Sequence, residues 1–198
     1  FDEITSGFHD NLGGKHLAYN INPDMAIFSK SIGNGFPIAA VIGTKAVMEN
    51  AQNTFISSLM WTERLGFVAG IATIEKMKKQ KIHNKTVKYG KKIKKVWKKI
   101  ADEFDIKIVI LGMDSIPEFY FDYKNKLELS TFFNQEMLKK GYLTNSRLAT
   151  TFAYTDKIID DYANACYETF KKISYYAGSD LKIPLKGSVR HSTFKRLN

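Results

Sequence analysis

The sequence contains one cysteine, Cys166, and four prolines in 198 residues. A single cysteine cannot form an internal disulfide, so the composition gives no sign of an oxidising compartment. No apolar run approaches the roughly 18 residues that a membrane-spanning helix requires. The start of the chain also lacks the charged segment and apolar core of a signal peptide. We therefore expect a cytoplasmic protein without a membrane partner.

Three kinds of site are also excluded by what is missing. The four histidines do not show the paired spacing of metal ligands, and no cysteine cluster accompanies them, so we expect no metal site. The Gly-x-Ser-x-Gly motif of many serine hydrolases does not occur. Gly33-Asn34-Gly35 lacks the third glycine of a dinucleotide-binding loop and is soon followed by Pro37, so we interpret it as a turn.

The overall composition is that of a globular protein. Hydrophobic residues make up 44% of the chain and charged residues 25%, which excludes a disordered or collagen-like protein. The length suits one ordinary domain or one and a half. The first residue is Phe1 rather than methionine, and Asp2-Glu3 follow it directly, as if a strand had been cut near its end. We therefore expect that a front half of the protein precedes this sequence.

The net charge of +10 comes from one stretch. Twelve lysines and no acidic residue lie between Lys76 and Lys99. Apolar residues recur in and after this stretch at the three- and four-residue steps of a helix: Ile82, Tyr89, Ile93, Val96, Trp97, Ile100 and Phe104. The pattern predicts an amphipathic helix with a solvated lysine face. Because the aromatic residues lie on the apolar stripe and arginine is nearly absent, we expect no nucleic-acid partner.

The first zone of the chain has α/β character. Within residues 24–43, two apolar runs separated by a turn rich in glycine and proline predict two buried strands. Residues 62–78 predict a helix that packs on a sheet. Its apolar residues are Leu65, Val68, Ala69 and Ala72, together with Ile74 and Met77 at the ends of the run 74–77.

A second zone begins near Gln80. After the basic helix we expect two strands, over 106–111 and 119–123. A helix over 129–140, ended by Gly141, and a helix over 155–174 complete this zone. On the last helix Cys166 shares one face with Ile158, Ile159, Tyr162, Ala163 and Phe170, which predicts a core cysteine rather than a reactive one.

Lys30 places a charged group at the end of an apolar run, close before a glycine turn. A buried ammonium needs a partner or a lowered pKa, and a neutral lysine amine is a nucleophile toward carbonyls. The plainer interpretation is that Lys30 reaches solvent through the turn. Asp2 also ends a strand-like segment, and the strand ends of an open α/β sheet meet at one crevice where ligands bind. An amine and a carboxylate there would suit pyridoxal phosphate, which needs a lysine for its Schiff base and an acid beside its ring nitrogen.

An ordered series of motifs covers the first forty or so residues: Asp2-Glu3-Ile4-Thr5-Ser6-Gly7-Phe8, Leu12-Gly13-Gly14, Tyr19, Pro23-Asp24, Ser29-Lys30, Gly33-Asn34-Gly35-Phe36-Pro37 and Gly43. Through them, residues 1 to about 175 resemble the C-terminal half of the class III aminotransferases, most closely the glutamate-1-semialdehyde aminomutase-like branch. The resemblance implies an α/β fold, the fold type I of transferases that use pyridoxal phosphate. Residues 1–79 would be the C-terminal part of the large domain, and residues 80–198 the small α+β domain.

The resemblance also implies roles for single residues. The lysine that matches Lys30 carries the cofactor as a Schiff base and moves the proton, and the acid that matches Asp2 pairs with the ring nitrogen. Ile4, two residues along a strand from Asp2, would face the cofactor ring, although core packing explains it equally well. The phosphate-binding threonine of the family aligns with Leu59, which has no hydrogen-bond donor on its side chain. That contact is therefore either lost or taken by Ser57 or Ser58, and of the two serines we favour Ser58.

The expected activity is transfer of an amino group between small amino and keto substrates, by an aminotransferase or an aminomutase that is a homodimer when complete. The phosphate loop of the family and its ring-stacking aromatic residue would lie before Asp2. We therefore expect the isolated chain to bind pyridoxal phosphate poorly and to have no turnover. The alternative function is a non-catalytic basic module that binds nucleic acid or acidic partners through Lys76–Lys99.

Overall fold

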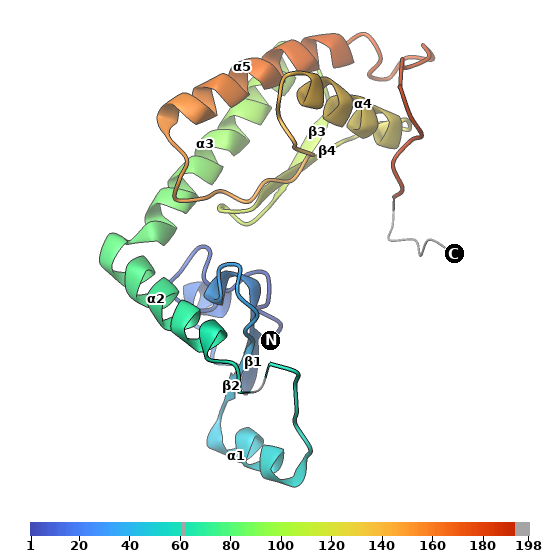
Figure 1. Cartoon of the computed structure of the whole chain (residues 1–198). Coiled ribbons are helices and arrows are strands. Elements are labelled where there is room, and N and C mark those ends of the chain that lie inside the picture. The colour runs from blue at the N-terminus through green and yellow to red at the C-terminus, as the bar shows by residue number, and fades with distance from the viewer. Residues whose placement is uncertain (61, 193–198) are drawn as a thin grey trace. The chain divides into compact units, whose positions relative to one another are not determined.

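The computed structural model describes residues 1–60 and 62–192 (Figure 1). The chain forms two units: unit 1 covers Phe1–Val87, and unit 2 begins at Lys88. Apart from one 17-residue helix, the elements that lie wholly within unit 1 are short, whereas unit 2 consists mainly of long helices around one β-hairpin. Among the described residues, no helix is both long and apolar enough to cross a membrane.

Strand β1 (Met25–Phe28) lies in the middle of the small sheet of unit 1. It pairs antiparallel with β2 (Ala40–Gly43), with Ile27 opposite Val41. On its other side, Asp2 forms a parallel bridge with Ile27. Ala26 and Phe28 are buried, but Val41 and Ile42 are 48% and 55% exposed. The prediction of two buried strands is therefore wrong for β2, because nothing in the described chain covers both faces of this strand.

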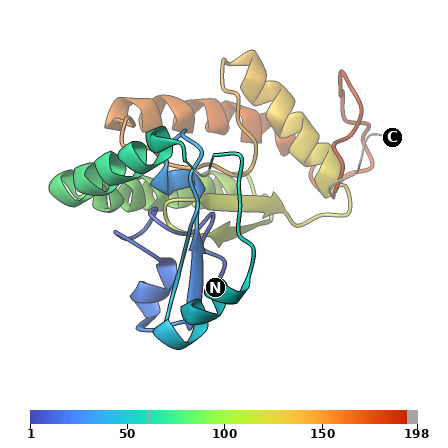
Figure 2. The same ribbon diagram turned by 60° about the horizontal axis from the view of Figure 1, so that its bottom comes forward.

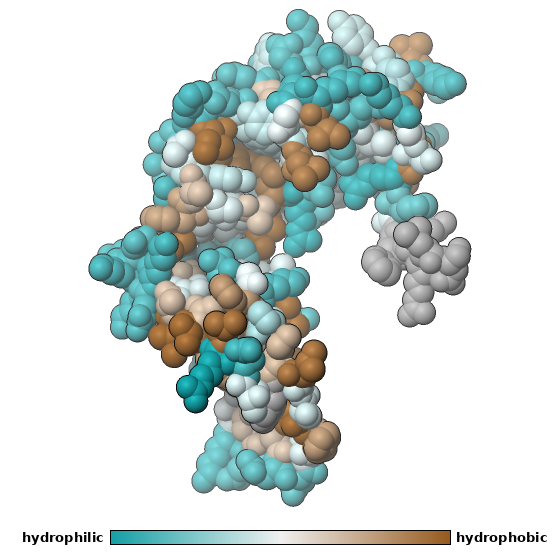
Figure 3. Space-filling model, viewed as in Figure 1, coloured by the Kyte–Doolittle hydropathy of each residue, from teal (hydrophilic) through white to brown (hydrophobic). Residues whose placement is uncertain are grey.

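Helix α2 (Arg64–Gln80) packs through its glycines rather than its large side chains. Gly66 and Gly70 are buried, whereas Leu65, Val68 and Ile71 are 58% to 63% exposed. A Cβ on Gly66 would lie 2.6 Å from the Pro37 carbonyl oxygen, so only glycine permits this approach. The predicted helix is confirmed, but the prediction that it buries its large apolar side chains is wrong. Apolar side chains at the surface of unit 1 are visible in Figure 3.

The basic stretch is divided between two helices. Residues 76–80 end α2, Lys81 has a left-handed φ of 48°, and α3 (Ile82–Glu103) follows. The basic stretch therefore does not form one continuous helix from Lys76, because the left-handed residue ends the hydrogen-bond ladder of α2. The predicted apolar stripe of α3 is confirmed, since Tyr89, Ile93, Trp97 and Ile100 are at most 5% exposed.

The remaining short elements of unit 1 are one-turn or two-turn helices between the strands and α2. They are η1 (Lys15–Tyr19), η2 (Lys30–Ile32), α1 (Lys45–Met48) and η3 (Glu49–Asn53). Of these, η2 follows β1 directly and begins with Lys30. The geometry of this turn therefore sets the position of the lysine.

Unit 2 is built around the antiparallel hairpin of β3 (Ile108–Gly112) and β4 (Pro117–Phe121), with Ile110 opposite Phe119. Residues near 147 extend the pairing on the other side of β4: Phe119 N donates to Ser146 O at 2.9 Å. Helices α4 (Lys126–Lys139) and α5 (Asp156–Ile173) complete the unit (Figure 2). All four elements occur within three residues of their predicted positions.

The core of unit 2 is rich in aromatic rings. Trp97, Phe119, Phe121, Phe133 and Phe170 are fully buried and form one cluster. Phe119 stands edge-to-face against the Phe121 and Phe133 rings, with centroids 5.4 and 5.3 Å away. Such pairs add to the free energy gained from burial alone. The residues of this core come from α3, the hairpin, α4 and α5, so the unit has its own hydrophobic core.

Candidate active site

Lys30 lies at the first turn after β1, in an unusual backbone conformation. Its φ is 47°, in the left-handed region that residues with a Cβ seldom adopt. The amides of Gly33 and Asn34 donate to the Lys30 carbonyl at 3.1 and 3.0 Å. Before it, Ser29 is extended and its hydroxyl donates to Ile38 O at 2.8 Å. The turn is thus fixed on both sides of the lysine.

The Lys30 side chain is exposed, and its Nζ donates a hydrogen bond to Thr5 Oγ1 at 2.7 Å. The sequence suggested either a buried ammonium with a partner or a side chain that reaches solvent. The structure combines a partner with exposure. An exposed amine on a fixed backbone is accessible to a small carbonyl compound.

Asp2 lies on the segment that runs parallel to β1. Glu3 N donates to Ile27 O at 2.9 Å, and Ile27 N donates to Phe1 O at 2.9 Å. Because parallel strands end at the same edge of a sheet, the segment that contains Asp2 and the strand that precedes Lys30 end at one edge. The Asp2 carboxylate is exposed, and its Oδ1 accepts from Ile4 N at 2.9 Å. The two segments thus run side by side, and the pairing of Asp2 with Lys30 across a cofactor stays a prediction.

Ile4 is half-buried and lies in a turn that covers residues 4–9. Strand pairing stops at Glu3, and Gly7 N donates to Glu3 O at 2.8 Å to close the turn. The alternation of side chains along a strand therefore does not apply to Ile4, and this argument for placing it on the side of Asp2 is wrong.

Ser58 lies in a segment, 54–63, whose described residues form no helix or strand. Its Oγ accepts a hydrogen bond from Met60 N at 3.2 Å, and Leu59 beside it is 95% exposed. Trp61, in the same motif, lies outside the described residues. In the described part of the chain, no hydrogen bond joins Ser58 to Lys30 or Asp2.

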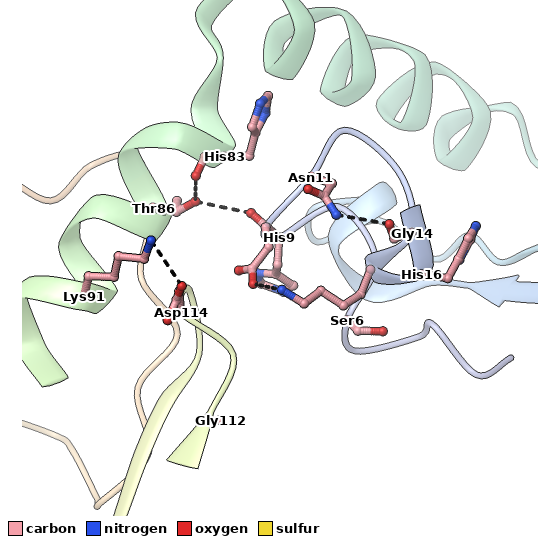
Figure 4. A network of polar contacts seen from close by, with 12 residues as sticks. Ser6, His9, Asn11, Gly14, His16, His83, Thr86, Lys91, Gly112 and Asp114 are labelled. Carbon is pink, nitrogen blue, oxygen red and sulfur yellow. Dashed lines mark hydrogen bonds and ion pairs between the residues drawn. The ribbon is translucent and has the colours of Figure 1, made fainter. Parts of the chain in front are cut away.

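Glu3 is a buried carboxylate beside the site that sequence reasoning missed. Its side chain accepts hydrogen bonds from Ser6 Oγ and, at 2.9 Å, from His16 N, and lies 2.9 Å from His16 Nδ1. Burial raises the pKa of Glu3, but these hydrogen bonds outweigh burial and lower the pKa overall. A Cβ on Gly14 would lie 2.2 Å from the His16 ring (Figure 4). No local sequence signal indicates this network, because His16 lies thirteen residues from Glu3.

Four lysines of α3 in unit 2 are paired with acids: Lys91, Lys92, Lys94 and Lys98. Lys92 lies 2.8 Å from Asp160 and 3.3 Å from Asp156, and Lys94 lies 3.1 Å from Asp114. These ion pairs neutralise part of the charge that a polyanion would contact. The interpretation of a solvated, paired lysine face is thereby favoured over a binding surface for polyanions.

Two other groups of the described chain bear on chemistry. Cys166 is fully buried, and burial raises the pKa of its thiol to about 12, so the prediction of a core cysteine is confirmed. Within residues 1–60 and 62–192, no group of three or more His, Cys, Asp or Glu side chains could hold a metal ion.

Sequence comparisons identify the family of the chain. A family model described as aminotransferase class-III matches residues 1–161. The chain is 27% identical over 191 residues to glutamate-1-semialdehyde 2,1-aminomutase of Sulfurihydrogenibium sp. (strain YO3AOP1). The aligned region covers 88% of this chain and 45% of the relative. It is 33% identical over 122 residues to 3-aminobutyryl-CoA aminotransferase of Cloacimonas acidaminovorans (strain Evry), covering 61% of this chain and 30% of the relative. The chain thus spans less than half the length of these curated relatives.

Solved structures show the same fold. The PLP internal aldimine form of the FumI protein of Sphingopyxis sp. MTA144 superposes with a TM-score of 0.82 at 17% identity, over 87% of this chain and 42% of that one. An omega-transaminase of Sphaerobacter thermophilus gives 0.79 at 15% identity, over 87% and 44%. The predicted fold type I is confirmed, in partial form. With the family model matching four-fifths of its length, the chain belongs to the class III aminotransferases.

Proposed function

We propose that this chain supplies the lysine-bearing half of an enzyme that transfers amino groups with pyridoxal phosphate. The observation that carries the proposal is the pair of parallel segments that end at one sheet edge, one with Asp2 and the other followed by Lys30. Membership of the class III family supports the same activity. The curated relatives named above are an aminomutase and an aminotransferase, and both activities move an amino group.

The residues at this edge fit pyridoxal phosphate. Bound there, the cofactor supplies an aldehyde for a lysine amine and a ring that accepts electrons. Lys30 offers an exposed primary amine held by one neutral hydroxyl, that of Thr5. Asp2 offers a carboxylate whose Oδ1 is engaged by Ile4 N, which leaves Oδ2 to hold the proton on a ring nitrogen.

Lys30 Nζ is the group that we assign to proton transfer. A lysine amine with an exposed position and a fixed backbone can accept a proton from a substrate carbon and return it to a neighbouring one. Thr5 Oγ1, which accepts from Nζ at 2.7 Å, would retain the amine at the sheet edge between these steps. Glu3, next to Asp2, is locked into its own buried network and would hold the Asp2 backbone in place.

Ser58 is our candidate for the cofactor phosphate. Its Oγ accepts from Met60 N, so the hydroxyl hydrogen is left to donate to a phosphate oxygen. Leu59 and Phe55, both 95% exposed, lie in the same segment. Exposed apolar side chains of this size are typical of a contact surface, and they support a homodimer in which this segment meets a second copy.

We assign residues 1–79 to the C-terminal part of the large domain and residues 80–198 to the small domain. In the structure the boundary between unit 1 and unit 2 falls between Val87 and Lys88, inside α3 and a few residues after residue 79. We place the protein in the cytoplasm, which the single, buried cysteine supports. Ile4 remains a candidate for contact with the cofactor ring because its backbone N–H is bonded to the Asp2 carboxylate.

The test uses the product of the complete reading frame that contains this chain. We expect borohydride reduction in the presence of pyridoxal phosphate to label the peptide that contains Lys30. The Lys30→Arg variant should lose this label, and Lys45→Arg, which alters an exposed lysine of the same unit, should keep it. A label on another lysine, or none, would contradict the proposal.

A second measurement tests the amino transfer itself. An amino donor added to the loaded protein should convert the cofactor to pyridoxamine phosphate, and Lys30→Arg should slow this conversion by roughly a hundredfold or more. Release of the keto product before any acceptor is added indicates an aminotransferase, whereas retention of that product indicates an aminomutase.

A further inference from the structure

His9 lies in the turn that follows Asp2 and Glu3, and its ring contacts the residue after Lys30. Nε2 of His9 lies 2.7 Å from Oγ of Ser31. The backbone carbonyl of His9 accepts a hydrogen bond from Thr86 Oγ1 at 3.3 Å (Figure 4). Both partners belong to unit 1. Thr86 thus fixes the backbone of His9, and the His9 ring in turn fixes the turn that contains Lys30.

The turn of residues 4–9 therefore contacts η2 at two points. Thr5 accepts from the Lys30 amine, and the His9 ring engages Ser31. Lys30 has a positive φ, which a residue with a Cβ keeps only when its surroundings impose it. Because Ser31 shares a peptide unit with Lys30, the His9 contact acts directly on that backbone.

Charge around His9 agrees with such a role. Burial lowers the pKa of His9, the Asp10 carboxylate opposes this effect, and the Lys30 ammonium adds to it. Asp10 itself is paired with Lys15 at 2.6 Å. The ring is consequently neutral at neutral pH, and it adds no positive charge beside the lysine amine.

We propose that His9 is a positioning residue for Lys30, which through its hydrogen bond with Ser31 holds the lysine in its left-handed conformation and the amine on Thr5. The proposal rests on the proposed function, in which Lys30 is the reactive amine. His9 itself is not assigned a contact with substrate or cofactor.

Competitive acetylation of the 198-residue chain tests this role without cofactor. Acetic anhydride is added in trace amounts, and mass spectrometry of peptides gives the acetylation rate of Lys30 relative to Lys45, whose side chain is 88% exposed. In His9→Phe the ring has no nitrogen to bond Ser31, so we expect the amine to leave Thr5. The Lys30 to Lys45 ratio should then rise about five-fold, as the loss of one hydrogen bond implies.

Two matched variants separate positioning from a general effect. Ser31→Ala should raise the ratio as His9→Phe does, and the double variant should raise it no further, because both remove the same bond. His9→Gln places an amide where Nε2 lies, so it should restore the wild-type ratio. Urea unfolding confirms that each variant is folded, and if His9→Phe does not fold, Ser31→Ala decides the question.

An unchanged ratio in Ser31→Ala, or a rise in His9→Gln equal to that in His9→Phe, overturns the proposal. Its failure is distinct from failure of the proposed function. Acetylation reports the amine alone, whereas borohydride labelling of the complete protein reports the cofactor, so either result can be negative while the other is positive.

Discussion

Glu136 of α4 is the buried charge on which we expect the acid stability of unit 2 to depend. The residue is 2% exposed. Burial raises its pKa, but hydrogen bonds from Lys139, Lys172 and Gln135 outweigh this effect and lower the pKa from 4.5 to about 2. Lys172 Nζ lies 2.7 Å from Oε2. The carboxylate is therefore held in its ionised form by partners from both α4 and α5.

The magnitude follows from linkage. A shift from 4.5 to about 2 corresponds to about 3 kcal/mol at 1.36 kcal/mol for each pKa unit. The Lys139 and Lys172 side chains are 47% and 52% exposed, and solvent screens their attraction, so we expect about 2 kcal/mol. Because the folded pKa is the lower one, the unfolded chain binds the proton first. The contribution is complete above about pH 5 and is lost as the pH falls toward 2.

Urea unfolding of wild type and Glu136→Gln at several pH values measures this contribution. Trp97 fluorescence in a Trp61→Phe background reports unit 2, since the chain has two tryptophans. We expect Glu136→Gln to be about 2 kcal/mol less stable at pH 7 and equal to wild type near pH 2. Glu168→Gln, at an exposed position of α5, is the control without effect. A difference that is constant from pH 7 to pH 2 would refute the reasoning.

Three further predictions concern unit 2. Gly90→Ala should destabilise the chain by about 3 kcal/mol or more in urea, because its Cβ would lie 1.4 Å from the Asp114 carbonyl oxygen; equal stability would show that the loop moves away freely. Cys166 should resist iodoacetamide at pH 8 until the chain is unfolded, since burial raises the pKa of its thiol to about 12; rapid native alkylation would contradict this. Thr155→Ala should cost about 1 kcal/mol by removing the cap on Ile158 N, whereas Thr155→Ser should not.

The helices of unit 2 were predictable because their residues are amphipathic in a simple way. In α3 the apolar residues recur at three- and four-residue steps and form the stripe that covers the hairpin, with Trp97 among them. Thr155 caps the first turn of α5. Gly141, with a φ of 85°, follows the end of α4. Local propensity and burial agree in these elements, so periodicity sufficed.

Unit 1 was less predictable because its apolar residues do not mark what is buried. Leu65 and Val68 suggested the inner face of α2, but the helix approaches residues 32–38 through Gly66 and Gly70. A glycine face carries no hydrophobic signal. The apolar residues of β2 were equally misleading, since Ile42 is 55% exposed.

Residue types and strand order were enough to predict which residues form the candidate site, but not their detailed contacts. Lys30 and Asp2 could be placed at strand ends, but the contact with Thr5 and the left-handed backbone of Lys30 depend on a turn that periodicity does not describe. The sequence assigned Glu3 no role beyond its place in the motif with Asp2. Its burial follows from hydrogen bonds with His16, thirteen residues away, which no local pattern indicates.

At position 30, lysine carries a conformational cost that glycine would not carry. Glycine at position 30 would relieve up to about 1 kcal/mol of conformational strain, so a gene copy under no constraint gains stability by losing this amine. If natural variants of the gene keep lysine at position 30, selection has preserved its chemical role at a cost in folding stability. Replacement of this lysine by glycine or asparagine would identify a decaying copy.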